Sequence, residues 1–230
     1  MLKYRKIRGI TMKKITKIEY QKNNKDRVSI YINDNFAFGI DLNIMIKYSL
    51  AKNMELDEEF IEEILKAEEE INVYNYALSV LARNAKSEKQ LRIKLKDKGY
   101  DLQFIDKAII KLKQQKYLDD ERYSEMLINS KINISKYGKR KIKEALYEKG
   151  IDREIIEEKI KMVTEEDELE RAYSLGIKKF KTLKEVDTRK NSIKLSNYLV
   201  NKGFDYSIVK KAVSKVLDNN CDELEDFTDY

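Results

Sequence analysis

Apolar and polar residues alternate between Ile15 and Asp41, and two Asn- and Asp-rich segments, 23–26 and 33–35, interrupt the alternation. A period of two is typical of half-buried strands, and such interruptions are typical of turns. The pattern therefore predicts a three-stranded antiparallel meander. Three strands with one apolar face need a covering layer, which we expect the following helices to supply.

Helical spacing replaces the alternation in the residues that follow. A short helix is predicted over 42–50. A longer helix is predicted to begin at Asp57, because aspartate is a favourable N-cap and acidic residues fill the first turn. Its apolar pattern continues past the acidic residues 68–70 as far as Ala85.

A short phrase then recurs about every 50 residues. It consists of lysine, glycine, an apolar or aromatic residue and aspartate, and it stands at 98–101, 149–152 and 202–205. Glycine readily takes the left-handed conformation that ends a helix, and aspartate accepts hydrogen bonds from the amides that begin the next one. Each phrase therefore predicts a helix, a glycine stop, an aspartate start and a second helix.

The apolar residues around the glycines keep their offsets in every copy, which predicts that they fill the cores. They are Leu91, Ile142 and Leu195; Leu95, Leu146 and Leu199; Ile105, Ile156 and Val209; Ile109, Ile160 and Val213; and Leu112, Val163 and Val216. An opening helix precedes each pair, over 73–84, after the segment 118–123, and over 167–180. Each unit is thus a three-helix bundle, and a row of such units is stabilised by the interfaces between neighbours.

These patterns predict a mainly α-helical protein with three tandem three-helix-bundle repeats and a small N-terminal β meander. The expected segments are a disordered basic N-terminus, a β meander with helices, the three repeats and an acidic tail. The disordered N-terminus spans 1–14 and the β meander with its helices spans 15–70. The three repeats span 71–117, 118–165 and 166–217, and the acidic tail spans 218–230.

Composition narrows the range of functions. The chain has no histidine and one cysteine, which excludes histidine-based catalysis, an internal disulfide and a multi-thiolate zinc site. No phosphate-binding loop, dinucleotide fingerprint or nucleophile elbow occurs. No apolar run is long enough for a membrane span. We therefore expect a cytoplasmic protein that is not an enzyme and uses no cofactor or metal.

The distribution of charge favours a polyanionic partner. The net charge is +6, although residues 218–230 carry six acidic side chains and no basic one, so the rest of the chain is strongly basic. A basic body of this kind suits nucleic acid, or an assembly that contains it.

Several motifs, in order and at matching spacing, resemble the RecX family of bacterial regulators of the RecA recombinase. They are the helix with Ala77 and Leu81, the helix Ser87-x-x-x-Leu91-x-x-x-Leu95, the junction Leu118-Asp119-Asp120-Glu121-Arg122-Tyr123, and Tyr137-Gly138-Lys139-Arg140-Lys141-Ile142 followed by Leu146 and Lys149-Gly150-Ile151. The resemblance is best over 72–163 and weaker in the third repeat, which lacks a counterpart of Gly138. Residues 15–70 resemble the N-terminal extension of longer members.

The resemblance implies that the bundles form an elongated, curved body that binds along the groove of RecA filaments on single-stranded DNA. It implies negative modulation, in which filament growth, ATP hydrolysis, strand exchange and coprotease activity are restrained. These activities belong to DNA repair, homologous recombination and the SOS response. Because no self-complementary apolar stripe is left over, we expect a monomer.

The middle helix of each repeat is basic, and these helices carry the candidate contacts to the filament or its DNA. The candidates are Lys89, Arg92 and Lys96 in the first repeat, Tyr137, Gly138, Lys139, Arg140, Lys141 and Lys143 in the second, and Arg189, Lys190 and Lys194 in the third. If the repeats stack in register, the cations form a stripe for phosphates. Alternatively each lysine is a solvated surface charge, Tyr137 lies in a core instead of stacking on a base, and Gly138 only shapes its loop.

Two other functions stay open. One is a general nucleic-acid-binding repeat protein whose effect on RecA is secondary. The other is a magnesium-dependent nuclease that uses Asp119, Asp120 and Glu121. The adjacency of these carboxylates argues against the nuclease, because neighbouring residues at a helix start point in different directions.

Overall fold

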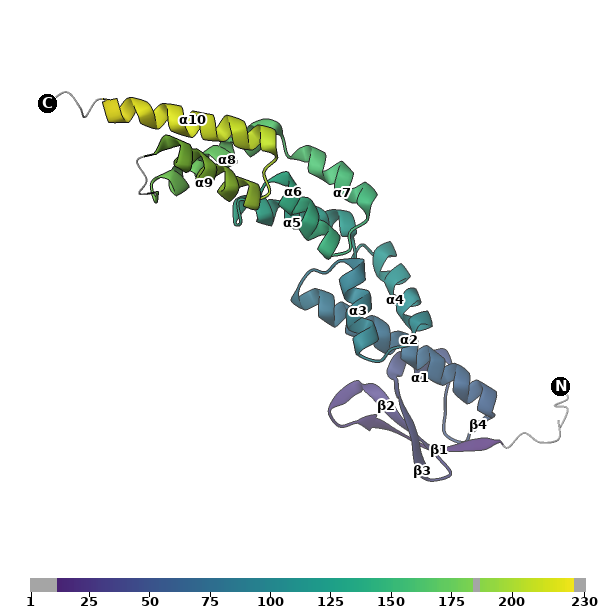
Figure 1. Ribbon diagram of the computed structural model, residues 1–230. Coiled ribbons are helices and arrows are strands. Elements are labelled where there is room, and N and C mark those ends of the chain that lie inside the picture. The colour runs from purple at the N-terminus through teal and green to yellow at the C-terminus, as the bar shows by residue number, and fades with distance from the viewer. Residues whose placement is uncertain (1–11, 184–186, 226–230) are drawn as a thin grey trace. The chain divides into compact units, whose positions relative to one another are not determined.

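The computed structural model describes residues 12–183 and 187–225, and the predictions for residues 1–11 and 226–230 lie outside the described residues. The described chain is mainly helical, with a small sheet near its N-terminal end (Figure 1).

Contacts divide the chain into two compact units. The first comprises Met1–Arg83 and Lys94–Tyr117, and the second comprises Asn84–Ile93 and Leu118–Tyr230. The division passes through one helix, the middle helix of the first repeat.

An antiparallel sheet begins the first unit. Strands β1 (Lys13–Gln21), β2 (Asn24–Ile32), β3 (Asn35–Asp41) and β4 (Glu55–Leu56) lie in the order β3-β2-β1-β4. The first three strands form the predicted meander, and the structure adds β4, which is too short to show a period. The turn at 33–35 contains two residues with positive φ (49° and 66°), as a tight hairpin requires.

Two helices cover the sheet, as the apolar face of the meander predicts. They are α1 (Leu42–Lys47) and α2 (Glu58–Arg83). Ile44 of α1 and Ile64 of α2 share one core with Ile15 of β1, and all three are buried.

Helix α2 runs unbroken across the acidic residues 68–70, and one of them, Glu68, joins it to the sheet. The buried Glu68 carboxylate accepts hydrogen bonds from the backbone N–H of Asp41 (2.7 Å) and from the side chain of Asn72 (3.0 Å), and it pairs with Arg27 (2.7 Å). A buried carboxylate with three partners is satisfied, and it ties α2 to β2 and β3.

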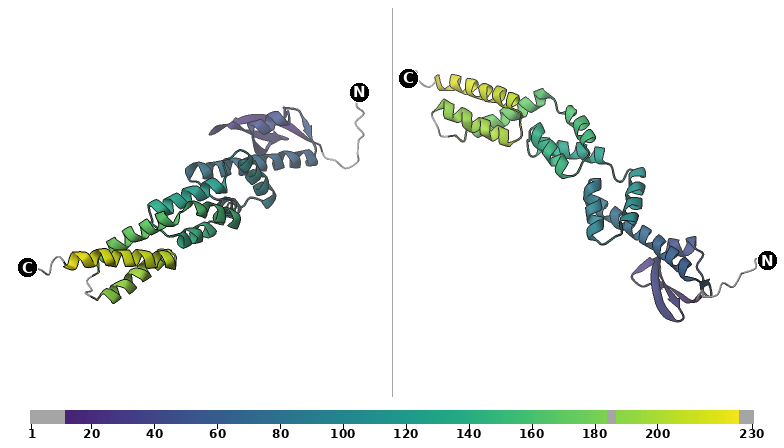
Figure 2. Two further views of the ribbon diagram at one scale, coloured as in Figure 1. Left: turned by 90° about the horizontal axis from the view of Figure 1, so that it is seen from above. Right: turned by 45° about the vertical axis from the view of Figure 1, so that its right-hand side comes forward.

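Helix pairs and bundles make up the rest of the described chain. They are α3 (Glu88–Asp97), α4 (Leu102–Gln114), α5 (Asp120–Asn133), α6 (Lys139–Glu148), α7 (Arg153–Lys159) with the short 3-10 helix η1 (Ile160–Met162), α8 (Glu165–Phe180), α9 (Thr188–Asn201) and α10 (Tyr206–Glu225). In the second unit, α10 packs against both α8 and α9 (Figure 2). Because α10 ends at Glu225, the first part of the acidic segment 218–230 is helical.

The glycine of the repeated phrase has the predicted geometry in all three copies, and the aspartate has it in the first. Gly99, Gly150 and Gly203 all have positive φ (92°, 76° and 88°), the conformation that ends a helix most easily at glycine. Asp101 then accepts a hydrogen bond from the backbone N–H of Gln103 (3.1 Å), whereas Asp152 makes no side-chain cap bond. Every apolar position that keeps its register across the three copies is buried, with at most 5% of its surface exposed.

Candidate functional site

The N-terminus of α6 lies against the glycine loop of the third repeat. The backbone N–H of Gly138 donates to the carbonyl of Lys202 (3.0 Å), and that of Arg140 donates to the carbonyl of Gly203 (3.1 Å). A Cβ atom at position 138 would lie 2.4 Å from the Gly203 oxygen. Gly138 therefore permits the close approach of another segment of the same chain, the Lys202-Gly203 loop.

A buried carboxylate completes this junction. Glu168 of α8 is 1% exposed, accepts a hydrogen bond from the backbone N–H of Lys139 (2.8 Å), and lies 3.8 Å from the Lys139 ammonium. Burial raises the pKa of Glu168, against the opposing effect of its contacts with Lys139. Burial also lowers the pKa of the neighbouring Arg171. The main contacts of Lys139 are therefore structural and join the second repeat to the third.

Arg140 and Lys141 make a second set of contacts across the same junction. The Arg140 guanidinium donates to the carbonyl of Val200 (2.6 Å), and the Lys141 ammonium donates to the carbonyl of Asn201 (3.1 Å). These carbonyls belong to the last turn of α9, where cations complement the helix dipole. Lys143 instead pairs with Glu157 of α7 (2.9 Å), and this hydrogen bond lowers the pKa of the Glu157 carboxyl.

The same construction occurs one repeat earlier, within the second compact unit. The Ser87 hydroxyl donates to the carbonyl of Lys149 (2.5 Å), and the Asp120 carboxylate accepts from the backbone N–H of Glu88 (2.8 Å). The N-terminus of α3 therefore packs against the Lys149-Gly150 loop. In the same way, the N-terminus of α6 packs against the Lys202-Gly203 loop. Lys89 belongs to this contact, because its aliphatic stem lies over Gly150.

Two tyrosines and four lysines form a surface at the junction of the second and third repeats. Three ammonium groups lie over the Tyr137 ring, from Lys131 (5.7 Å to the ring centroid), Lys141 (4.9 Å) and Lys202 (5.3 Å). Lys202 also lies 5.9 Å from the Tyr198 ring, which Lys179 approaches to 5.8 Å. We call these six residues the tyrosine–lysine surface.

The tyrosine–lysine surface carries uncompensated positive charge. Among the described residues no ion pair involves any of its four lysines. Both tyrosines are partly exposed. Lysines suit phosphates or an acidic protein face, and partly exposed aromatic rings suit unstacked bases.

Sequence reasoning selected only part of this surface. It identified Tyr137 and Lys141 but left out Lys131, Lys179, Lys202 and Tyr198 as site candidates. Lys202 carried a usable signal, because it precedes the repeated glycine. The others come from three different helices and are joined only by the fold.

The remaining candidates lie elsewhere. Arg92 pairs with Glu88 on its own helix (2.7 Å), and Lys96 is exposed on the part of α3 that belongs to the first unit. Arg189, Lys190 and Lys194 lie on α9. Lys190 and Lys202 are twelve residues apart, about 18 Å along a helix, so Arg189 and Lys190 lie at the other end of α9 from Lys202. Lys194 lies one turn from Tyr198.

The carboxylates considered for a nuclease do not converge. Asp119 accepts from the backbone N–H of Arg122 (3.0 Å), Asp120 accepts from the backbone N–H of Glu88, and Glu121 pairs with Lys159 (3.1 Å). Within residues 12–183 and 187–225 no group of three or more metal-ligating side chains occurs. No helix in these ranges is both long and apolar enough to cross a membrane.

Comparison with family models accounts for most of the chain. The matches are the N-terminal domain of regulatory protein RecX (residues 13–57) and the first (74–112), second (119–160) and third (165–213) three-helix domains of RecX. The third repeat, where the resemblance in sequence is weakest, thus matches a model of its own.

Relatives and solved structures agree with the family models. The chain is 37% identical over 211 residues to regulatory protein RecX of Clostridioides difficile (strain 630), with 92% of this chain and 98% of the relative covered. It is 39% identical over 210 residues to regulatory protein RecX of Clostridium perfringens (strain 13 / Type A), with 90% and 98% covered.

Two crystal structures share the fold. A crystal structure of regulatory protein RecX matches with a TM-score of 0.74 at 30% identity, covering 86% of this chain and 97% of that one. A structure of RecX from Lactobacillus salivarius matches with a TM-score of 0.63 at 27% identity, covering 65% and 97%.

Proposed function

The chain belongs to the RecX family of regulatory proteins, and on this premise we propose that it binds RecA filaments on single-stranded DNA and restrains them. The proposed restraint falls on ATP hydrolysis, strand exchange and coprotease activity. It acts by binding, without catalysis by this chain.

The tyrosine–lysine surface is the observation that supports the proposal. A filament of recombinase on single-stranded DNA offers phosphates, unstacked bases and acidic protein side chains. Lys131, Lys179 and Lys202 have no carboxylate partners among the described residues, so phosphates or carboxylates of the filament would meet unneutralised charge. Tyr137 and Tyr198 add ring faces between these charges.

Arg140 and Lys141 have a different part in this proposal from Lys131 and Lys202. Because Arg140 and Lys141 hold carbonyls of α9, they keep the second and third repeats together as one binding body. Variants at these two residues would alter the junction and the surface at once. Lys131 and Lys202 are therefore the better positions for testing binding.

The direct test is single-stranded-DNA-dependent ATP hydrolysis by the cognate RecA, titrated with this protein. Binding to naked single-stranded DNA is measured in parallel at the same salt concentration. The proposal predicts loss of hydrolysis at protein concentrations too low to coat the DNA. Hydrolysis that persists until the DNA itself is saturated would overturn it.

That second outcome would favour general nucleic-acid binding. The tyrosines support this alternative, because base–aromatic stacking needs no recombinase. It predicts similar affinity for naked DNA and for DNA coated with RecA, whereas the filament proposal predicts a clear preference for the coated DNA.

A further inference from the structure

A pocket of about 380 Å³ lies within the first compact unit, between α1, α2 and α4. Its floor is apolar and is formed by Ile44, Ala67, Ile71 and Ala108. Ala67, Ile71 and Tyr74 share one face of α2, because residues three or four apart are neighbours on a helix. The two alanines leave open the space that larger side chains would fill.

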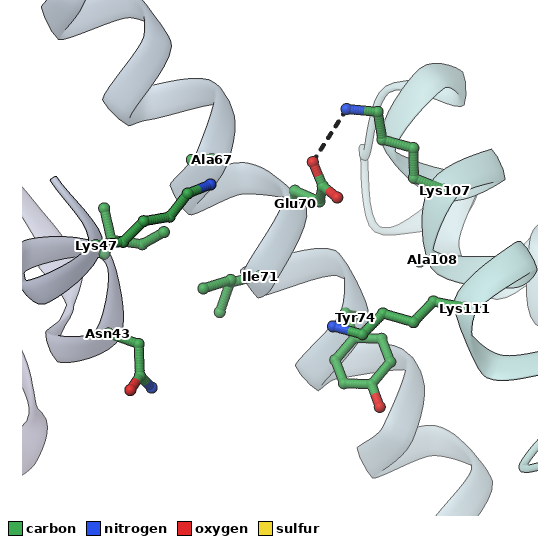
Figure 3. A pocket seen from close by; sticks show the side chains of 10 residues that line it. Asn43, Lys47, Ala67, Glu70, Ile71, Tyr74, Lys107, Ala108 and Lys111 are labelled. Atoms are coloured by element: carbon green, nitrogen blue, oxygen red, sulfur yellow. Dashed lines mark hydrogen bonds and ion pairs between the residues drawn. The ribbon is translucent and has the colours of Figure 1, made fainter. Parts of the chain in front are cut away.

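The rim of this pocket is basic. Lys47 comes from the end of α1, and Lys107 and Lys111 come from α4 (Figure 3). Glu70 is the single carboxylate in the lining, and it pairs with Lys107 (3.0 Å). Within the described residues, Lys47 and Lys111 have no carboxylate partner and lie against aromatic rings instead.

The side of the pocket formed by Tyr74 is held in place. The Tyr74 hydroxyl hydrogen-bonds to the carboxamide oxygen of Gln115 (2.5 Å), and the Lys111 ammonium lies 4.2 Å from the ring centroid. In Figure 3 Lys111 reaches over Tyr74 from α4 and Lys47 reaches toward α2 from the other side, with Ile71 between them.

We propose that this pocket binds a nucleotide unit, with its sugar or base on the apolar floor at Ile71 and its phosphates at Lys47 and Lys111, which stand on opposite sides of that floor. Lys47 and Lys111 each offer an ammonium group without a carboxylate partner among the described residues, which fits the negative charge of a phosphate. The apolar floor and the volume, which lies in the range of small-molecule sites, fit the uncharged part of the same ligand. The nucleotide unit is either a free nucleotide or part of a nucleic-acid strand.

Isothermal titration of the full-length chain tests this site with two probes, ATP and the trinucleotide pTpTpT. The wild type is expected to bind at least one of them, and the tighter probe identifies the source of the nucleotide. Lys47→Glu and Lys111→Glu are each expected to weaken binding about tenfold, because each reverses a charge-assisted contact. Lys52→Glu is the matched control, since Lys52 is an exposed lysine of the same unit outside the pocket lining, and it is expected to change nothing.

A second variant separates space from charge. Ala67→Leu keeps every charge and fills the pocket, so it is expected to remove binding while circular dichroism shows an intact fold. The proposal is overturned if the wild type binds neither probe, if Lys47→Glu and Lys111→Glu bind like Lys52→Glu, or if Ala67→Leu binds normally. None of these outcomes depends on RecA, so they are distinct from failure of the filament proposal.

Discussion

A Cβ atom at position 138 would meet the backbone oxygen of Gly203 and the backbone nitrogen of Phe204, both at 2.4 Å. Neither backbone atom can move without shifting the loop that carries it. The φ of Gly138 is −79°, which any residue adopts. Glycine is needed here because the backbones of the second and third repeats are in close contact, and not because the backbone conformation is unusual.

Gly138→Ala is therefore expected to lower the free energy of unfolding by about 1–3 kcal/mol, as overpacking in a close contact does. Urea unfolding followed by circular dichroism measures the change. Gly39→Ala is a suitable control, because the nearest atom to a Cβ there is the mobile end of the Gln21 side chain. Equal stability of the two variants would show that the junction can relax around the methyl group.

At the scale of elements, hydrophobic periodicity predicted the helices, the meander and the buried positions, because burial of one face imposes its period on the sequence. Periodicity could not predict the junctions. The backbone N–H of Lys139 donates to Glu168, and the Arg140 side chain donates to the backbone carbonyl of Val200. Backbone groups are the same at every position, so a sequence pattern does not indicate which of them form such contacts. Tyr198 likewise joins the tyrosine–lysine surface only through the packing of α9 beside α6.

The contact between α8 and α6 predicts a pH dependence of stability. Burial raises the pKa of Glu168 above its ordinary value of 4.5, so the folded protein keeps this proton at pH values where the unfolded chain has lost it. The stability that this proton contributes is complete below pH 4.5 and is lost as the pH rises through the folded pKa.

Glu168→Gln removes this titration and leaves an oxygen to accept from the Lys139 backbone N–H. Relative to that variant, the wild type is expected to lose stability on going from pH 4 to pH 7, measured by urea unfolding. Glu166→Gln, an exposed change on the same helix, controls for general charge effects. A wild type that gains stability relative to Glu168→Gln over this range would contradict the assignment.

At the scale of the whole molecule, the net charge of +6 does not reveal where a polyanion would bind. Many of the basic side chains are engaged by carboxylates or carbonyls of the chain, as Lys143, Lys159 and Arg27 are. At the tyrosine–lysine surface, by contrast, four lysines without an ion pair among the described residues lie around two tyrosines. Electrostatic binding there is expected to weaken as salt rises.

The salt dependence of binding to single-stranded DNA follows from this distribution. Lys131→Glu combined with Lys202→Glu is expected to reduce the slope of log affinity against log salt by about 2 in magnitude, one for each lost phosphate contact. Fluorescence anisotropy with a labelled oligonucleotide measures the slope. An unchanged slope would place the phosphate contacts on other lysines.

The most direct measurement of the central claim compares three forms of the protein as inhibitors of DNA-dependent ATP hydrolysis by the cognate RecA. They are the wild type, the Lys131→Glu, Lys202→Glu double variant, and Lys211→Glu, which changes an exposed lysine of α10. We predict that the wild type and Lys211→Glu inhibit at the same concentrations, below those that coat the DNA, and that the double variant needs at least tenfold more. Equal inhibition by all three would contradict the assignment of this surface, and no inhibition by any of them would contradict regulation of the filament.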